Sequence, residues 1–208
     1  MSTLVLVRHA QATAFAEDTD RLSALGEQQA IRLGEYWRDA GVRFDEVHTG
    51  TMRRHLRTAE LAGFSNYQTS DAFNEYDAYG ILRALPDYQR PTDNRHLQSM
   101  FDAAMPQWIA GTLVAPGVET FHAFHTRVIS ALRTILEADL GSRRVVVFTS
   151  GGPIGVAVQS VLGAPERMAI ELNWRIRNCS LTEFLFTRGR VSLDQFNSTP
   201  HLSEVTYR

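Results

Sequence analysis

The sequence contains a single cysteine, Cys179, and no long hydrophobic segment. One cysteine excludes a disulfide within the chain and is typical of proteins in a reducing cytoplasm. No apolar run approaches the roughly 18 residues that span a bilayer. The first apolar run, residues 4–7, is too short for a signal peptide, and an arginine and a histidine follow it directly. We therefore expect a cytoplasmic protein with no membrane partner.

The chain also lacks a large charge excess and any basic run. Its formal net charge is −2 at pH 7, and its sequence pI is near 6.4. Proteins that bind nucleic acid need clustered lysines and arginines to neutralise phosphates, so nucleic acid is not an expected partner. The 208 residues, of which 44% are hydrophobic, suffice for one large core. We predict a single domain over residues 1–208.

What the sequence does contain is an alternation of strand and helix patterns. Residues 4–7 and 145–148 are continuous apolar runs, typical of strands buried on both faces of a sheet. Further strands are predicted over residues 44–48, 67–69, 180–186 and 191–196, the last two as a hairpin, and helices over 23–40, 52–62, 119–140, 154–162 and 166–174. This alternation predicts an α/β fold, a three-layer α/β/α sandwich whose mostly parallel sheet has helices on both faces.

A proline-containing segment around residues 78–116 interrupts the alternation. It predicts an insertion of short helices over the sheet, where a cap that shapes a substrate site would lie. A purely structural excursion remains an alternative. Arg83, Arg90 and Arg95 of this segment could contact a second anionic group of a substrate, or they could simply be solvated.

Side chains that suit an anionic ligand follow several of the predicted strands. Arg8 and His9 follow the first strand, at the sheet edge where α/β proteins bind ligands. Ser150 and Gly151 follow the strand predicted over residues 143–148, which contains the second apolar run. They lie in a glycine turn that would direct backbone N–H groups at an anion or simply cap the next helix. Arg54 lies at the start of the helix over 52–62, where arginines oppose the helix dipole unless an anion lies nearby.

Glu75 adds a carboxylate to this set of arginines and a histidine. Together they are the groups required for phosphoryl transfer through a phosphohistidine. A neutral imidazole attacks phosphorus, guanidinium groups bind the phosphoryl oxygens, and a protonated carboxyl group donates to the leaving oxygen. No metal is required, and His122 and His125 lack a third ligand that would indicate one. A salt-bridged arginine and a hydrogen-bonded histidine at a strand end remain the plainer interpretation of Arg8 and His9.

The motifs taken together resemble the histidine phosphatase superfamily, which has the phosphoglycerate mutase-like fold, over nearly the whole chain. Residues 8–10 are similar to the Arg-His-Gly signature with an alanine in place of the glycine, and residues 54–59 to the Arg-x-x-x-Thr-Ala motif. Residues 22–30, 74–77, 117–120 and 196–202 resemble further motifs of the family. The resemblance implies His9 as nucleophile, Glu75 as proton donor and a phosphate site of Arg8, Arg54, Ser150 and Gly151, with no metal and no cofactor.

The main departure from the family is Ser150, which stands where its members usually have a second histidine. A serine hydroxyl can still donate to a phosphoryl oxygen but carries no positive charge. Loss of one transition-state donor costs on the order of 10²–10³ in rate. Because the other groups are present, the resemblance implies an active but slow phosphatase for phosphate monoesters. A phosphate- or phosphoprotein-binding relative without turnover and a phosphomutase stay open as alternatives.

Residues 13–16 differ from the Trp-Asn segment that follows the signature in glycolytic mutases, and this difference favours hydrolysis. The expected partner is a small phosphorylated substrate or a phosphoprotein. The sequence does not determine the oligomeric state, so a homodimer also stays open.

Overall fold

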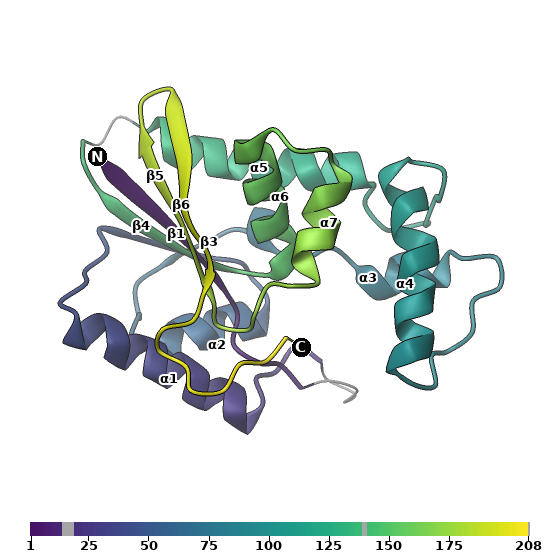
Figure 1. Cartoon of the computed structure of the whole chain (residues 1–208), viewed down its shortest axis with the longest axis horizontal. Helices are drawn as coiled ribbons and strands as arrows, with labels where there is room; N and C mark the ends of the chain where they lie inside the picture. The colour runs from purple at the N-terminus through teal and green to yellow at the C-terminus, as the bar shows by residue number, and fades with distance from the viewer. Residues whose placement is uncertain (14–18, 139–140, 208) are drawn as a thin grey trace.

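A computed structural model describes residues 1–13, 19–138 and 141–207 of the chain. The described residues form one six-stranded sheet with helices packed on both of its faces (Figure 1). In chain order the elements are β1 (Ser2–Arg8), α1 (Ala24–Asp39), β2 (Glu46–Thr49), α2 (Arg53–Leu61), β3 (Gln68–Thr69), the 3₁₀ helix η1 (Asp71–Phe73), α3 (Ala78–Arg83), α4 (Asn94–Ile109), α5 (Phe121–Glu137), β4 (Arg144–Thr149), α6 (Gly151–Leu162), α7 (Arg167–Asn173), β5 (Leu181–Thr187) and β6 (Arg190–Ser198).

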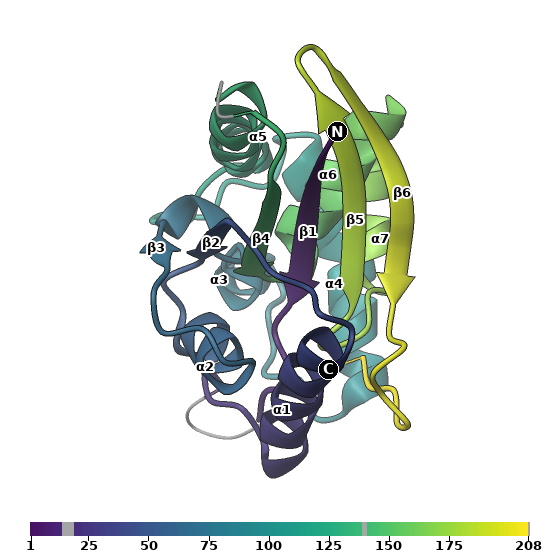
Figure 2. The same cartoon turned by 90° about the vertical axis from the view of Figure 1, so that its left-hand side faces the viewer.

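The strand order across the sheet is β3-β2-β4-β1-β5-β6. The four strands from β3 to β1 are parallel to one another, whereas β5 pairs antiparallel with β1 and with β6. Figure 1 shows α1 and α2 below the sheet and α5, α6 and α7 on its other side, and Figure 2 shows the same sheet turned by 90°. The predicted α/β fold, with a mostly parallel sheet between two helical layers, is therefore confirmed.

The central strand β1 contributes side chains to two separate cores, because alternate residues of a strand face opposite sides. Leu4 and Leu6 pack in the core under α4 to α7, and Val5 and Val7 pack in the core under α1 and α2. All four side chains are buried. The continuous apolar run in the sequence thus marks a strand that is covered on both faces.

Two helix starts show how local sequence sets the element boundaries. The Gly26 N–H donates to Ser23 Oγ at 3.0 Å, so Ser23 caps α1 as predicted. Helix α6 begins at Gly151 rather than at Ile154, so the predicted glycine turn is in fact the first helical turn. The predicted helix start was wrong because Gly151 and Gly152 leave room for Asn173 and Glu75 to pack against the first turn of the helix.

The prediction of only short helices in residues 78–116 was wrong as well. Helix α4 has 16 residues and contains Pro106 in its interior. Proline removes one backbone donor from a helix. Burial of Leu97, Phe101 and Trp108 on one side of α4 offsets that cost.

Parts of two predicted segments lie outside the described residues. They are residues 14–18 of the polar stretch that follows the first strand, and residues 139–140 at the end of the helix predicted over 119–140. In the described part of the chain, every helix is too short or too polar to cross a bilayer.

Replacement of Leu33 by alanine tests the core between the sheet and α1. The Leu33 side chain has no exposed surface, so Leu33→Ala should lower the free energy of unfolding by about 2–5 kcal/mol. The matched control is Ile31→Ala on the same helix, because Ile31 is 42% exposed and its truncation should cost far less. Urea denaturation of the three proteins measures both effects, and equal midpoints for the two variants would contradict the assignment of the buried face.

Candidate active site

The candidate site lies where β1 and β4 leave the sheet side by side. Their parallel register ends at Arg8 opposite Thr149, and the His9 N–H donates to the Thr149 carbonyl at 2.8 Å. The residues that follow each strand, His9 and Ser150, are therefore held next to one another. This placement follows the rule that α/β sheets bind ligands at the carboxyl ends of their strands.

A cavity of about 280 Å³ opens at this edge of the sheet. It is lined by four of the six predicted site residues, namely Arg8, His9, Arg54 and Glu75. Its walls also include residues of α3, α4 and α7 and residues next to them, namely Tyr76, Tyr79, Leu97, Phe101, Asn173 and Trp174. Helix α4 of the segment 78–116 therefore contributes directly to the cavity.

His9 is fixed in one tautomer by the backbone. Its Nδ1 lies 2.8 Å from the Ala10 carbonyl oxygen, which can only accept, so Nδ1 carries the proton and Nε2 keeps its lone pair. Burial is the largest cause that holds the pKa of His9 well below its usual 6.5, and Arg54 and Arg8 lower it further. The ring is thus neutral near pH 7, with a free electron pair on Nε2.

Two guanidinium groups accompany this imidazole. Arg8 Nη1 donates to the carbonyl oxygens of Ile176 and Tyr207. Arg54 Nη1 binds Asp20 Oδ1 at 2.8 Å, while the buried Nε of Arg54 has no hydrogen-bond partner among the described residues. Both arginines therefore keep their orientation before any ligand binds.

Asp20 also explains why arginines are tolerated at the start of α2. Its carboxylate accepts from the backbone N–H groups of Arg53 at 2.9 Å and of Arg54 at 3.4 Å. A carboxylate at a helix N-terminus is favoured by the helix dipole. The anion that the sequence leads one to expect near these arginines is thus provided by the chain itself, from a residue that precedes α1.

Glu75 is held at the N-terminus of α6. The Gly152 N–H donates to Glu75 Oε2 at 3.1 Å, and a Cβ at position 152 would lie 2.0 Å from Glu75 Oε1. Only glycine therefore leaves room for this approach. Burial raises the pKa of Glu75 and outweighs the opposite effects of the Gly152 hydrogen bond, Arg54 and Arg8. The protonated, proton-donating form of Glu75 is favoured as a result.

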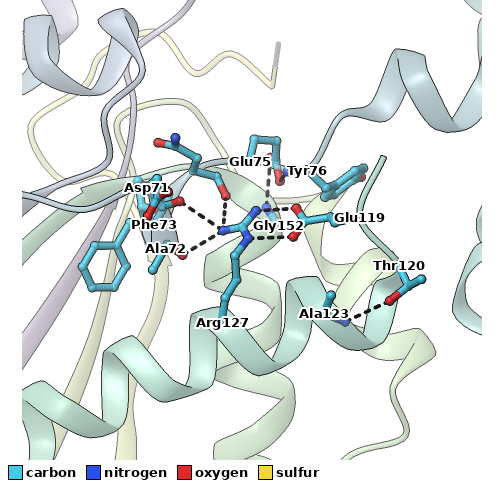
Figure 3. Close-up of polar contacts among 12 residues, drawn as sticks. Asp71, Ala72, Phe73, Glu75, Tyr76, Glu119, Thr120, Ala123, Arg127 and Gly152 are labelled. Carbon is cyan, nitrogen blue, oxygen red and sulfur yellow. Dashed lines mark hydrogen bonds and ion pairs between the residues drawn. The ribbon is translucent and has the colours of Figure 1, made fainter. Parts of the chain in front are cut away.

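Arg127 of α5 fixes the segment that carries Glu75 (Figure 3). Its guanidinium group pairs with both carboxylate oxygens of Glu119 at 2.8 and 2.6 Å. The remaining nitrogen, Nη1, donates to the carbonyl oxygens of Asp71, Ala72 and Asn74 at 3.3, 2.9 and 3.0 Å. The sequence analysis missed this residue, because backbone acceptors leave no side-chain pattern to detect.

The last two predicted site residues, Ser150 and Gly151, are buried and are not among the residues that line the cavity. Ser150 has no exposed surface, and its Oγ lies 2.7 Å from Nε2 of His55. A Cβ at position 151 would lie 1.9 Å from Asn173 Oδ1, so glycine allows Asn173 to approach α6. His55 is the histidine that the sequence analysis missed, although it follows Arg54 directly and Ser150 itself signals a missing imidazole.

Other candidates from the sequence are placed away from the cavity. Arg83 is exposed and lies 3.6 Å from Asp77, and Arg90 and Arg95 are exposed as well. His125 Nε2 lies 3.0 Å from Gln159 Oε1, and within the residues that the structure describes no three His, Cys, Asp or Glu side chains gather as a metal site would require.

A neutral imidazole with a directed lone pair, two oriented guanidinium groups and a buried acid define an α/β protein with a histidine-based anion site. The model of the histidine phosphatase superfamily (branch 1) matches residues 4–199. The chain belongs to this superfamily, which confirms the resemblance seen in the motifs.

Individual relatives agree with this membership. A probable phosphoglycerate mutase, GpmB, from Citrobacter koseri is 30% identical over 193 residues, which cover 88% of this chain and 84% of the relative. A mutant phosphoserine phosphatase from Entamoeba histolytica, solved with phosphoserine, matches with a TM-score of 0.71 at 18% identity over 97% of this chain and 100% of that one. The α-ribazole phosphatase from Shigella flexneri matches with a TM-score of 0.68 at 19% identity over 95% and 96% of the two chains. At these identities the solved structures show the shared fold.

The buried histidines should make stability depend on pH. Burial holds the pKa values of His9 and His55 well below 6.5, so below about pH 6.5 the unfolded chain binds these protons first. The free energy of unfolding should therefore fall as the pH drops from about 7 to about 5, each histidine contributing up to about 1.4 kcal/mol per pH unit. His55→Gln should reduce this slope in phosphate-free urea titrations.

The matched control is His122→Gln, because His122 is exposed on α5 and its replacement should keep the slope of the unmodified chain. Glu75 titrates with the opposite sign but equally in all three proteins, so it cancels from the comparison. An unchanged slope in His55→Gln would show that this ring is not buried as a neutral group.

Proposed function

We propose that the chain is a phosphatase that hydrolyses phosphate monoesters through a phosphohistidine intermediate on His9. The observation that carries this proposal is the hydrogen bond between His9 Nδ1 and the Ala10 carbonyl, which leaves Nε2 as the nucleophilic atom. His9 lines the same cavity as the two arginines and the acid that such a reaction needs.

In the first step Nε2 of His9 attacks phosphorus, and the bond from phosphorus to the ester oxygen breaks. Glu75 gives its proton to the departing oxygen, so the alcohol leaves neutral. Arg8 and Arg54 bind the phosphoryl oxygens. The buried Nε of Arg54, which has no hydrogen-bond partner in the described part of the chain, supplies one of the donors. The lowered pKa of His9 and the raised pKa of Glu75 shift both groups toward the forms that this step uses.

In the second step water attacks the phosphorus of the phosphohistidine. The Glu75 carboxylate takes the proton of the water, the bond from Nε2 to phosphorus breaks, and inorganic phosphate leaves. Glu75 is then protonated again for the next cycle. Side chains of the protein perform every proton transfer in this scheme, so the proposed reaction needs neither a metal nor a cofactor.

The cavity favours a small monoester with an uncharged leaving group. Among its described lining residues, Arg8 and Arg54 are the cationic side chains, and the bound phosphoryl group would occupy both. A phosphoglycerate also carries a carboxylate, and the arginines of residues 78–116 lie outside the cavity. A volume of about 280 Å³ suits a small molecule better than a folded phosphoprotein. Hydrolysis is thus favoured over a phosphoglycerate mutase reaction.

We also propose that the reaction takes place in the cytoplasm. Cys179 is a free, buried thiol whose pKa is raised by burial, which suits a reducing compartment.

The nucleophile is tested by trapping the intermediate. Acid quenching with a labelled phosphate monoester should leave label on His9, and His9→Ala should lose both the label and at least about 10⁴-fold in turnover. His122→Ala, at an exposed histidine outside the cavity, is the control and should keep both. Phosphate binding without label or turnover would instead support the binding-only relative, and transfer to a second hydroxyl in preference to water would support a mutase.

The acid is tested by changing the leaving group. Glu75→Gln should lower kcat/KM for an alkyl phosphate by about 10²–10⁴-fold, because the alkoxide then leaves without a proton. The loss should be much smaller for p-nitrophenyl phosphate, whose leaving group needs no proton. Glu60→Gln, at a half-exposed carboxylate on α2 outside the cavity, serves as control. Equal losses for the two substrates would contradict the role of Glu75 as proton donor.

A further inference from the structure

A second buried histidine lies beside the nucleophile and has no part in the reaction described above. His55 of α2 has no exposed surface, and its ring centroid lies 5.7 Å from that of His9. A Cβ at position 50 would lie 2.2 Å from Nδ1 of His55, so glycine at the end of β2 makes room for this ring. The chain therefore builds a closely fitted place for an imidazole.

The ring binds a hydroxyl group that is itself held out of its ordinary role. Ser150 occupies the N-cap position of α6, yet its side chain accepts no N–H from the helix. Its Oγ lies 2.7 Å from His55 Nε2 instead. An N-cap serine normally accepts a helix N–H, which stabilises the helix start. Since Ser150 makes no such bond, its contact with His55 sets the direction of the hydroxyl.

The direction of that bond follows from the other ring nitrogen. His55 Nδ1 is buried without a hydrogen-bond partner among the described residues, so a proton there would be an unsatisfied buried donor. Burial, and after it the charge of Arg54, lowers the pKa of His55 and so disfavours a second proton on the ring. The neutral ring therefore carries its proton on Nε2 and donates to Ser150 Oγ. The hydroxyl proton of Ser150 is then left for another acceptor.

Backbone contacts on both sides place Ser150 between the nucleophile and the acid. The preceding residue, Thr149, accepts from the His9 N–H at 2.8 Å. Gly152, two residues further on, donates to Glu75 at 3.1 Å. A phosphoryl group bound between His9 and Glu75 would thus lie against the start of α6, where the Ser150 hydroxyl is.

We propose that His55 is a positioning residue that acts through Ser150. It holds the Ser150 hydroxyl at the start of α6, from where the O–H donates to a phosphoryl oxygen once substrate binding moves aside the residues that cover Ser150. The His55–Ser150 pair would then stand in for the second histidine expected at position 150, with the imidazole supplied by α2. This inference rests on the proposed function, since it assigns a further donor to the same phosphoryl site.

Kinetics with p-nitrophenyl phosphate test the pair. His55→Ala and Ser150→Ala should each lower kcat by about 10²-fold, and the double variant should be no slower than either single variant, because the two residues act as one unit. His55→Gln, which keeps an N–H donor near the position of Nε2, should recover at least about tenfold over His55→Ala. His125→Ala, at a histidine bonded to Gln159 away from the cavity, should keep the unmodified rate.

An unmodified kcat in His55→Ala would overturn the pair, and so would a double variant whose loss is the product of the two single losses. The pair is also wrong if His55→Gln is as slow as His55→Ala although the two variants have equal urea midpoints. Should His55→Ala fail to fold, His55→Gln combined with Ser150→Ala gives the same comparison.

Calorimetric binding of inorganic phosphate separates this inference from the proposed function. The unmodified protein could neither turn over substrate nor trap label, while both single variants lose phosphate affinity and the double variant loses no more than either. The proposed function is then wrong and the donor pair stands. If the protein turns over and both variants keep the unmodified rate and phosphate affinity, then the function stands and the pair is wrong.

Discussion

The parallel pairing of β1 with β4 is the constraint on which the candidate site depends. Its register ends at Arg8 and Thr149, and the bond from the His9 N–H to Thr149 extends it by one residue. Both strands are buried on both faces, so a shift by one residue would move every apolar side chain to the wrong core. The register is therefore strongly specified, and it holds the nucleophile of one strand next to the helix start that follows the other.

Burial at this edge of the sheet then sets the protonation states. It is the largest cause of both the lowered pKa of His9 and the raised pKa of Glu75. The nearby arginines reinforce the first shift and only partly oppose the second. Burial thus favours the neutral form of both the imidazole and the carboxyl group, the forms that nucleophilic attack and proton donation require. The side chains that orient these groups, among them Arg127 and Asp20, come from segments remote in the sequence.

Much of this arrangement could be predicted, and the exceptions have a common cause. His9 and Glu75 follow predicted strands and Arg54 lies at the start of a predicted helix that follows one. Because parallel strands end at one edge of a sheet, their meeting was foreseeable. The role of Arg127 could not be foreseen, because it binds backbone carbonyls 53 to 56 positions away. The role of Asp20 could not be foreseen either, because it caps a helix more than thirty residues further along the chain. Each depends on which segments pack together.

The sequence by itself determined the strands, the hairpin, most of the helices and the Ser23 cap, because periodicity and capping act over a few neighbouring residues. Only the tertiary structure decided that α4 continues through Pro106, since the burial that offsets the proline comes from other elements. It alone brought His55 to Ser150 across 95 positions. Hydrogen bonds between distant segments form only once the cores have packed, and no local pattern records which partners that packing will provide.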